Sequence, residues 1–178
     1  MDEKQLFVAL LLAACVARLE CKWPFLGTDW NMREFVKTPE SIWTYSTSQA
    51  TDIICKKDSK LFVTLQSIVF FRSYYHKKRK LIFRLQGEFD PRRKARMTIF
   101  ARDGTLNQTE EIIYMSMKLT CAVVQVTLNF GSYAKLYDLR IRNSTTREPI
   151  EPKCLDVFRS RAVKKVYVLY QNRCQYLP

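Results

Sequence analysis

Residues 42–170 are dominated by short segments in which apolar and polar side chains alternate, and this two-residue period constrains the fold more than any other feature. Period two is typical of β-strands, because successive side chains of a strand point to opposite faces. We predict about eight strands, and no segment between them is long enough for the helical crossover that parallel pairing requires. The strands are therefore expected to be antiparallel. The simplest closure is an all-β, eight-stranded up-and-down barrel, with a sandwich as the alternative.

The expected strands are rich in β-branched and aromatic residues. They cover residues 42–47, a segment that carries Cys55, residues 60–75, 81–86, 95–102, 111–118, 121–130 and 135–142. A short helix capped by Asp29 is expected before them, with Trp30 as a plug for one end of the β-domain. A second short helix is expected at residues 154–162, followed by a last extended segment at 163–170.

The strand at residues 135–142 places a carboxylate and a guanidinium on one face. Leu136, Asp138 and Arg140 alternate with Tyr137, Leu139 and Ile141, so Asp138 and Arg140 are neighbours on the same side. We expect both side chains to project into the middle of the barrel.

The first residues are typical of a secretory signal peptide. Residues 6–16 form an apolar run too short to span a membrane comfortably, and it ends in the small-residue cleavage pattern Cys15, Val16 and Ala17. We predict that residues 1–17 are removed and that residues 18–178 form a single secreted domain. No later segment is long and apolar enough for a membrane span.

Removal of Cys15 would leave five of the six cysteines, namely Cys21, Cys55, Cys121, Cys154 and Cys174. In an oxidising compartment four of them would pair and one would be left over, and the sequence alone allows several pairings. Two sequons, beginning at Asn107 and Asn143, predict glycosylation in the same compartment.

The chain is strongly basic, with a formal net charge of +13. Two basic runs, at residues 77–80 and 92–94, are expected at hairpin loops, where charged side chains are usually solvated. A charge of this size also favours acidic partners such as glycosaminoglycans. Nucleic-acid binding is not expected, because no recognisable reading motif accompanies the charge.

An enzyme is not expected either. His76 is the one histidine, so the chain offers no histidine pair for zinc and no other obvious base for a nucleophile. The four glycines are too scattered to form a phosphate-binding loop, and no catalytic residue, metal site or cofactor is predicted.

A set of short segments, in a fixed order, resembles the tick salivary lipocalins, the secreted family that includes histamine-binding proteins. The segments are Trp30 leading to 42–45 (IWTY), Cys55, Cys121, 137–139 (YDL), 152–155 (PKCL) with Phe158, and 166–168 (VYV) before Cys174. The resemblance implies an eight-stranded lipocalin barrel with a ligand cavity, used against host inflammation and haemostasis. It also implies that Cys55 pairs with Cys174 and Cys121 with Cys154, which leaves Cys21 unpaired.

The first functional hypothesis is a carrier that sequesters a host inflammatory or lipid mediator, such as a fatty acid, an eicosanoid or a sterol. An apolar cavity with a few placed polar groups is the physical requirement. The expected lining is Trp43, Tyr45, Phe71, Phe83 and Tyr114, with Asp138 and with Arg140 offering its charge to a carboxylate. The alternative is that these aromatic rings simply fill a small barrel.

The second hypothesis is binding of a biogenic amine, histamine or serotonin, as the resemblance implies. Compared with amine-binding members, this chain has Ala122 in place of an aspartate, Asp138 in place of a glutamate and Arg140 in place of an aromatic residue. An amine site would need Asp138, a further acid such as Glu88 or Asp103, and Trp43 as an aromatic wall. The third hypothesis is a cationic surface, at residues 77–80 and 92–94, that binds glycosaminoglycan or an acidic host protein.

Overall fold

The computed structural model describes residues 30–101, 103–104, 106–129, 135–163 and 165–177. The predicted signal peptide at residues 1–17, Cys21 and the predicted helix cap Asp29 lie outside the described residues. No helix among the described residues is long and apolar enough to cross a membrane.

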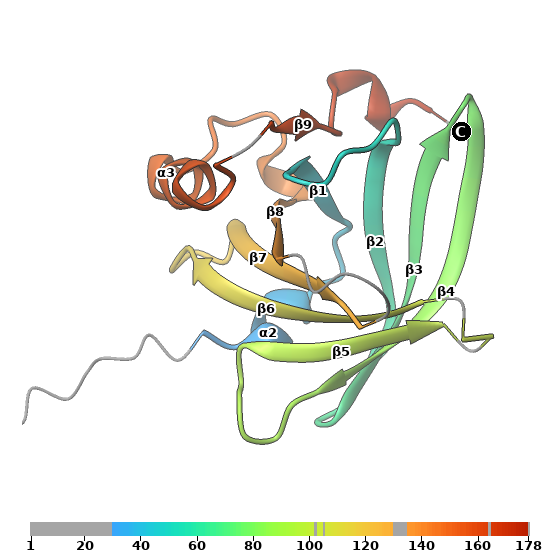
Figure 1. The fold of residues 1–178 in the computed structure, drawn as a ribbon, viewed down its shortest axis with the longest axis vertical. Coiled ribbons are helices and arrows are strands. Elements are labelled where there is room, and N and C mark those ends of the chain that lie inside the picture. Colours follow the sequence, from blue (N-terminus) through green and yellow to red (C-terminus); the bar gives the residue numbers. More distant parts are fainter. Residues whose placement is uncertain (1–29, 102, 105, 130–134, 164, 178) are drawn as a thin grey trace, which may run out of the picture.

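Eight antiparallel strands form a closed barrel, and this confirms the predicted fold (Figure 1). The strands are β1 (Ile42–Thr47), β2 (Ile54–Val63), β3 (Ser67–His76), β4 (Arg79–Phe89), β5 (Arg96–Ala101), β6 (Asn107–Met115), β7 (Cys121–Leu128) and β8 (Lys135–Arg142). Each strand from β2 to β7 pairs with the next one in the chain, and β1 pairs with both β8 and β2, which closes the ring. A short ninth strand, β9 (Tyr167–Val168), pairs with β1.

Two short helices flank the barrel, as predicted. In α2 (Met32–Val36) the side chain of Asn31 caps the first turn, accepting hydrogen bonds from the backbone N–H groups of Arg33 and Glu34. The observed cap therefore lies two residues after the predicted cap Asp29. The second helix, α3 (Pro152–Arg161), starts at a proline, a residue suited to the first helical turn.

Two disulfides, Cys55–Cys174 and Cys121–Cys154, connect the C-terminal region to the barrel. The first holds the chain end against β2, and the second holds α3 against β7. Both pairs are the ones that the family resemblance implies.

The apolar residues form two separate cores because each strand has two faces. The first core lies inside the barrel and is sealed at one end by Met32, Phe35 and Val36 of α2. The second lies outside the barrel, between the sheet and the C-terminal region, and contains both disulfides together with Trp43 and Phe158. A side chain can therefore be fully buried in this protein without facing the barrel interior.

The two ends of the barrel differ. The end covered by α2, here the closed end, includes the β2–β3 turn and the β4–β5 loop, at the bottom of Figure 1. At the opposite end, here the open end, the β3–β4 hairpin extends beyond the neighbouring strands. Among the described residues, residues 79–84 of β4 pair with β3 alone, and the pairing of β4 with β5 begins at Leu85.

Candidate functional site in the barrel interior

Asp138 and Arg140 project into the barrel, as predicted. Each is only 2% exposed, and an Arg140 Nη2 donates to the Asp138 carboxylate at 3.3 Å. On β7, Asp138 lies opposite Val124 and Arg140 lies opposite Ala122. On β1, Arg140 lies opposite Thr44. The pair is therefore part of the interior of the protein and not of its surface.

Arg140 is held by a second and stronger partner, Glu110 of β6. The two terminal nitrogens of Arg140 donate to the two carboxylate oxygens of Glu110 at 2.6 and 2.7 Å, and Glu110 has no exposed surface. Such bidentate pairs combine charge with fixed geometry. Carboxylates thus engage both terminal nitrogens of Arg140, and among the described residues its Nε is left without a partner.

The ion pairs continue across the barrel to β3 and β2. Arg72 donates to Glu110 at 3.1 Å and makes a bidentate contact with Asp58 at 2.8 and 2.7 Å. At the other side, the Lys56 ammonium lies 3.2 Å from the Asp138 carboxylate. We call Lys56, Asp58, Arg72, Glu110, Asp138 and Arg140 the interior ion network. It contains three cations and three carboxylates, so its charges balance.

The cations of the network hold Glu110 and Asp138 ionised in spite of their burial. Burial alone would raise the pKa of Glu110, but the guanidinium groups of Arg140 and Arg72 outweigh it and keep that pKa well below its ordinary value. Burial would likewise raise the pKa of Asp138, and Lys56 and Arg140 reverse the direction. For Lys56 burial is the larger effect, so its pKa is lowered although Asp138 partly compensates.

The part of the interior toward the closed end is filled. A partly open pocket there has a volume of about 20 Å³ and is lined by residues including Ile42, Phe70 and Arg140. A cavity of that size holds about one water molecule. A ligand larger than water therefore has no room between the network and α2.

The inner face toward the open end is apolar and only partly covered. Tyr74 and Phe83 stack there with ring centroids 5.7 Å apart, and Phe83 is 38% exposed. Leu81 and Leu136 occupy inner positions at the same end and are half-buried. Lys56 belongs to this level, because a register shift leaves Cys55 and Lys56 together against Tyr74 and the Lys56 ammonium contacts Asp138 inside the barrel. Aromatic and aliphatic surface thus lies beside the ammonium group of the network.

The structure does not bring the predicted lining residues together. Trp43 is buried in the outer core, where its Nε1 donates to Asn143 at 2.8 Å and its ring meets the edge of Tyr170. Tyr45 stacks on Tyr170 in the same core. These two rings are covered by the C-terminal segment, which explains their burial on the outside of the barrel.

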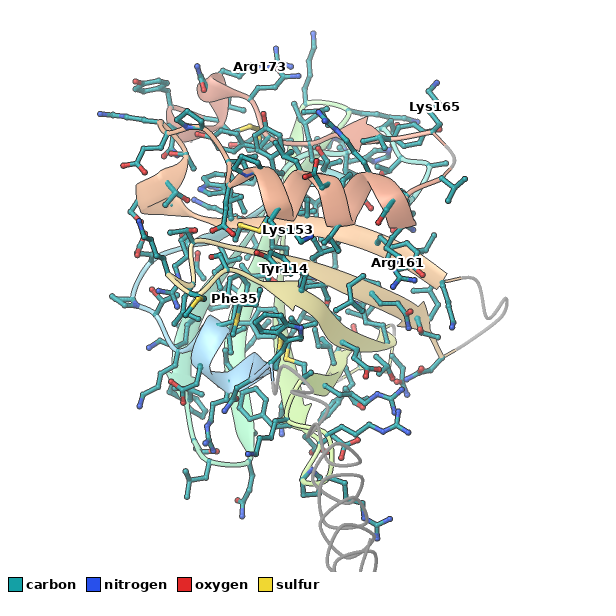
Figure 2. The ribbon with its side chains drawn as sticks, turned by 90° about the vertical axis from the view of Figure 1, so that its left-hand side faces the viewer. Phe35, Tyr114, Lys153, Arg161, Lys165 and Arg173 are labelled. Atoms are coloured by element: carbon teal, nitrogen blue, oxygen red, sulfur yellow. A yellow bond between two sulfur atoms is a disulfide. The ribbon has the colours of Figure 1, made fainter. Side chains whose placement is uncertain are left out.

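Tyr114 also lies on the outer face, beneath the start of α3 in Figure 2. Its hydroxyl donates to Glu151 at 2.8 Å, and burial together with this carboxylate raises the pKa of Tyr114 to about 12. Phe71 points outward and is 39% exposed, opposite Arg84. Of the five predicted aromatic residues, Phe83 alone lies on the inner face.

The acids proposed as partners of Asp138 in an amine site are not inside either. Glu88 follows the inward-facing Gly87 and is exposed on the outer face of β4, and Asp103 is exposed in the β5–β6 turn. Trp43, the expected aromatic wall, lies on the other side of the sheet. That arrangement of an amine site is therefore wrong in its geometry.

Sequence reasoning missed Lys56, Asp58, Arg72 and Glu110. The signal was present in the alternation: Arg72 lies between Phe70 and Tyr74 on the inner face of β3, and Glu110 occupies the corresponding inner position of β6. When several strands carry charged residues at alternate positions that face the interior, these residues can pair with one another across a barrel.

No family model matches the sequence, and no curated protein sequence matches it. Among solved structures, the AM182 serotonin complex superposes with a TM-score of 0.68 at 14% identity, covering 85% of this chain and 97% of that one. The siderocalin Ex-FABP, described as having dual ligand specificities, gives a TM-score of 0.57 at 13% identity, covering 75% and 94%. A dog lipocalin allergen gives 0.54 at 10% identity, covering 75% and 94%.

The chain has the lipocalin fold. At these identities the likeness concerns the fold alone, so membership of the tick salivary lipocalins stays a prediction. In this chain the interior ion network occupies the middle of the barrel and leaves the inner face toward the open end as the candidate site.

Proposed function

We propose that this lipocalin binds a small amphipathic molecule at the open end of its barrel, with an acidic head group on Lys56. The apolar body of the ligand would lie against Tyr74, Phe83 and Leu136. This refines the lipid-mediator hypothesis by replacing Arg140 with Lys56 as the cation that meets the ligand.

The position and free donors of Lys56 are the observation that supports the proposal. Its ammonium carries three donors, and among the described residues Asp138 is its one hydrogen-bond acceptor. The Lys56 side chain is 13% exposed, compared with 3% for Arg140 and 6% for Arg72, so it is the most accessible cation of the network. An incoming carboxylate could accept from Lys56 without breaking the Arg140–Glu110 pair.

Biogenic amine binding is the second candidate, and the serotonin complex of a structural neighbour is the observation in its favour. In this chain, however, the Lys56 ammonium already occupies the Asp138 carboxylate at 3.2 Å. A ligand ammonium would have to displace it and leave Lys56 buried without a partner, which is costly. The geometry thus favours an acid over an amine.

Secretion and sequestration of a host mediator belong to the same proposal. Two disulfides fit an oxidising compartment, and they hold the chain end and α3 against the barrel. Glycosylation at Asn107 and Asn143 also remains a proposal. Binding of glycosaminoglycan through residues 77–80 and 92–94 rests on charge alone.

Calorimetric titration with palmitic acid, hexadecanol and serotonin tests the proposal. The acid and the alcohol share the apolar chain, so their difference isolates the head group. We expect palmitic acid to bind about tenfold or more tightly than hexadecanol, because a hydrogen bond to a charged group contributes about 1.5–3 kcal/mol. Equal affinities would remove the role of Lys56, and tighter binding of serotonin than of the acid would favour the amine.

A further inference from the structure

The closed end of the barrel carries three exposed apolar side chains near one turn. Leu61 is 46% exposed, Phe62 50% and Leu65 76%. Lys60 pairs with Phe70 and Phe62 with Val69, so Leu61 is an extra residue that interrupts the register of β2. Such a bulge re-aims side chains, and here both Leu61 and Phe62 are exposed where strict alternation would place one of them inside.

The β2–β3 turn that carries Leu65 is held in one conformation by hydrogen bonds. The hydroxyl oxygen of Thr64 accepts from the backbone N–H groups of Gln66 and Ser67 at 3.2 and 2.9 Å. The backbone N–H of Thr64 donates to the Ser67 carbonyl at 2.8 Å. Leu65 is therefore presented at the tip of a preorganised turn.

Basic residues lie beside this apolar turn. Hydrogen bonds hold α2 and the end of β4 against it. Arg33 of α2 donates to the Leu65 carbonyl at 3.1 Å. The Phe89 N–H donates to the Gln66 carbonyl at 2.8 Å, which places the end of β4 and the following β4–β5 loop beside the turn. Both segments reach the lower end of the molecule in Figure 1.

The β4–β5 loop contributes two exposed arginines. The Asp90 carboxylate accepts from the backbone N–H groups of Arg92 and Arg93 at 2.8 and 3.1 Å, so this acid stabilises the loop while the two guanidinium groups remain exposed. The basic residues of this end are Arg33, Lys37, Arg92, Arg93 and Lys94. Its acids are the exposed Glu34 and Glu88 and the half-buried Glu40 and Asp90, so five bases face four acids. The charge around the tip is therefore positive.

We propose that the closed end docks onto an anionic lipid surface, with Leu61, Phe62 and Leu65 at the acyl boundary and the surrounding cations on the head groups. Apolar side chains beside basic residues are the combination that peripheral membrane binding uses. A second copy of the chain fits this end less well, because two sets of arginines would face each other. The proposal is independent of the barrel ligand, and it leaves the open end turned toward solution.

Co-sedimentation with lipid vesicles tests the proposal. Vesicles of phosphatidylcholine with about 30 mol % phosphatidylserine should retain the protein, and pure phosphatidylcholine vesicles should not. The double substitution Phe62→Ser with Leu65→Ser should weaken retention by at least about tenfold. Arg92→Gln with Arg93→Gln should weaken it by roughly fivefold for each charge removed.

Matched substitutions outside the closed end distinguish docking through this end from nonspecific adsorption to vesicles. Ile82→Ser with Val163→Ser removes exposed apolar surface away from the closed end, and Lys77→Gln with Lys78→Gln removes the same charge at the open end. Both control variants should bind vesicles like the unchanged protein. Equal losses in control and test variants would overturn the proposal, because the effect would then follow net charge or hydrophobicity alone.

Hydrogen exchange with and without vesicles gives a second readout that does not depend on substitution. Amides of residues 61–66 and 92–94 should gain protection, and those of residues 76–80 should not. Sedimentation that shows dimers broken by the Phe62→Ser and Leu65→Ser changes, without vesicle binding, would assign the surface to a second copy of the chain and contradict the proposal. Full competition by soluble glycerophosphoserine would also contradict it, since the apolar tip would then contribute nothing.

Discussion

Glu110 is the residue on which the interior ion network most depends. It is fully buried and accepts from both Arg140 and Arg72, so its loss would leave two buried guanidinium groups short of a partner. We expect Glu110→Gln to lower the free energy of unfolding by on the order of 3 kcal/mol, the range for breaking a buried pair by removing one partner. Urea denaturation at neutral pH measures this change.

The same residue gives the network a pH dependence. Because the pKa of Glu110 is lowered in the folded state, its contribution is fully present above the unfolded pKa, near 4.5, and is lost as the pH falls through the folded pKa. The stability difference between the unchanged protein and Glu110→Gln should therefore shrink as the pH is lowered below about 4.5. A difference that stays constant down to pH 3 would contradict the assigned shift.

Gly87 lies on the inner face of β4, where the neighbouring strands leave no room for a side chain. A Cβ at Gly87 would lie 2.9 Å from Ile68 Cγ2 and 3.2 Å from Met97 Sδ. We expect Gly87→Ala to destabilise the protein by about 1–3 kcal/mol, as overpacking of a filled core does. Gly104→Ala is a spatial control, because no atom of the described residues lies within 4 Å of a Cβ there, although its φ of +75° adds backbone strain of its own.

The C-terminal elements depend on the disulfides. Cys121–Cys154 closes a separation of 33 residues and Cys55–Cys174 one of 119. In the chain-entropy account, replacing the first pair by alanines should cost about 4 kcal/mol and the second about 5 kcal/mol. Hydrogen exchange should show faster opening of α3 in the first variant, and unchanged protection there would indicate that packing alone holds the helix.

The elements could largely be read from the sequence, whereas the site could not. Alternation and turn residues indicated the eight strands and both helices, because strand geometry imposes the period on every exposed or half-buried segment. The sequence predicts that Trp43 and Tyr45 are covered, but it does not show whether they lie on the inner or the outer face of the sheet. These rings are buried by the C-terminal segment, and only the tertiary path of residues 169–174 decides that.

For the barrel interior, the sequence predicts the direction of a side chain but not its partner. The inward direction of Asp138 and Arg140 followed from parity, yet their partners Lys56 and Glu110 come from strands far away in sequence. Sequence order does not reveal which inward charges meet across a closed barrel. The sequence therefore predicts a ligand contact for Arg140, whereas in the structure Glu110 engages it.

For the molecule as a whole, the central claim is that a ligand enters at the open end and that Lys56 recognises its acidic group. Lys56→Met keeps the length of the side chain and removes the ammonium, while Arg140 still pairs with Asp138. We predict that this substitution weakens palmitic acid binding about tenfold or more and changes hexadecanol binding little, as measured by calorimetry on both variants. Equal losses for the two ligands, or no loss for the acid, would contradict the account.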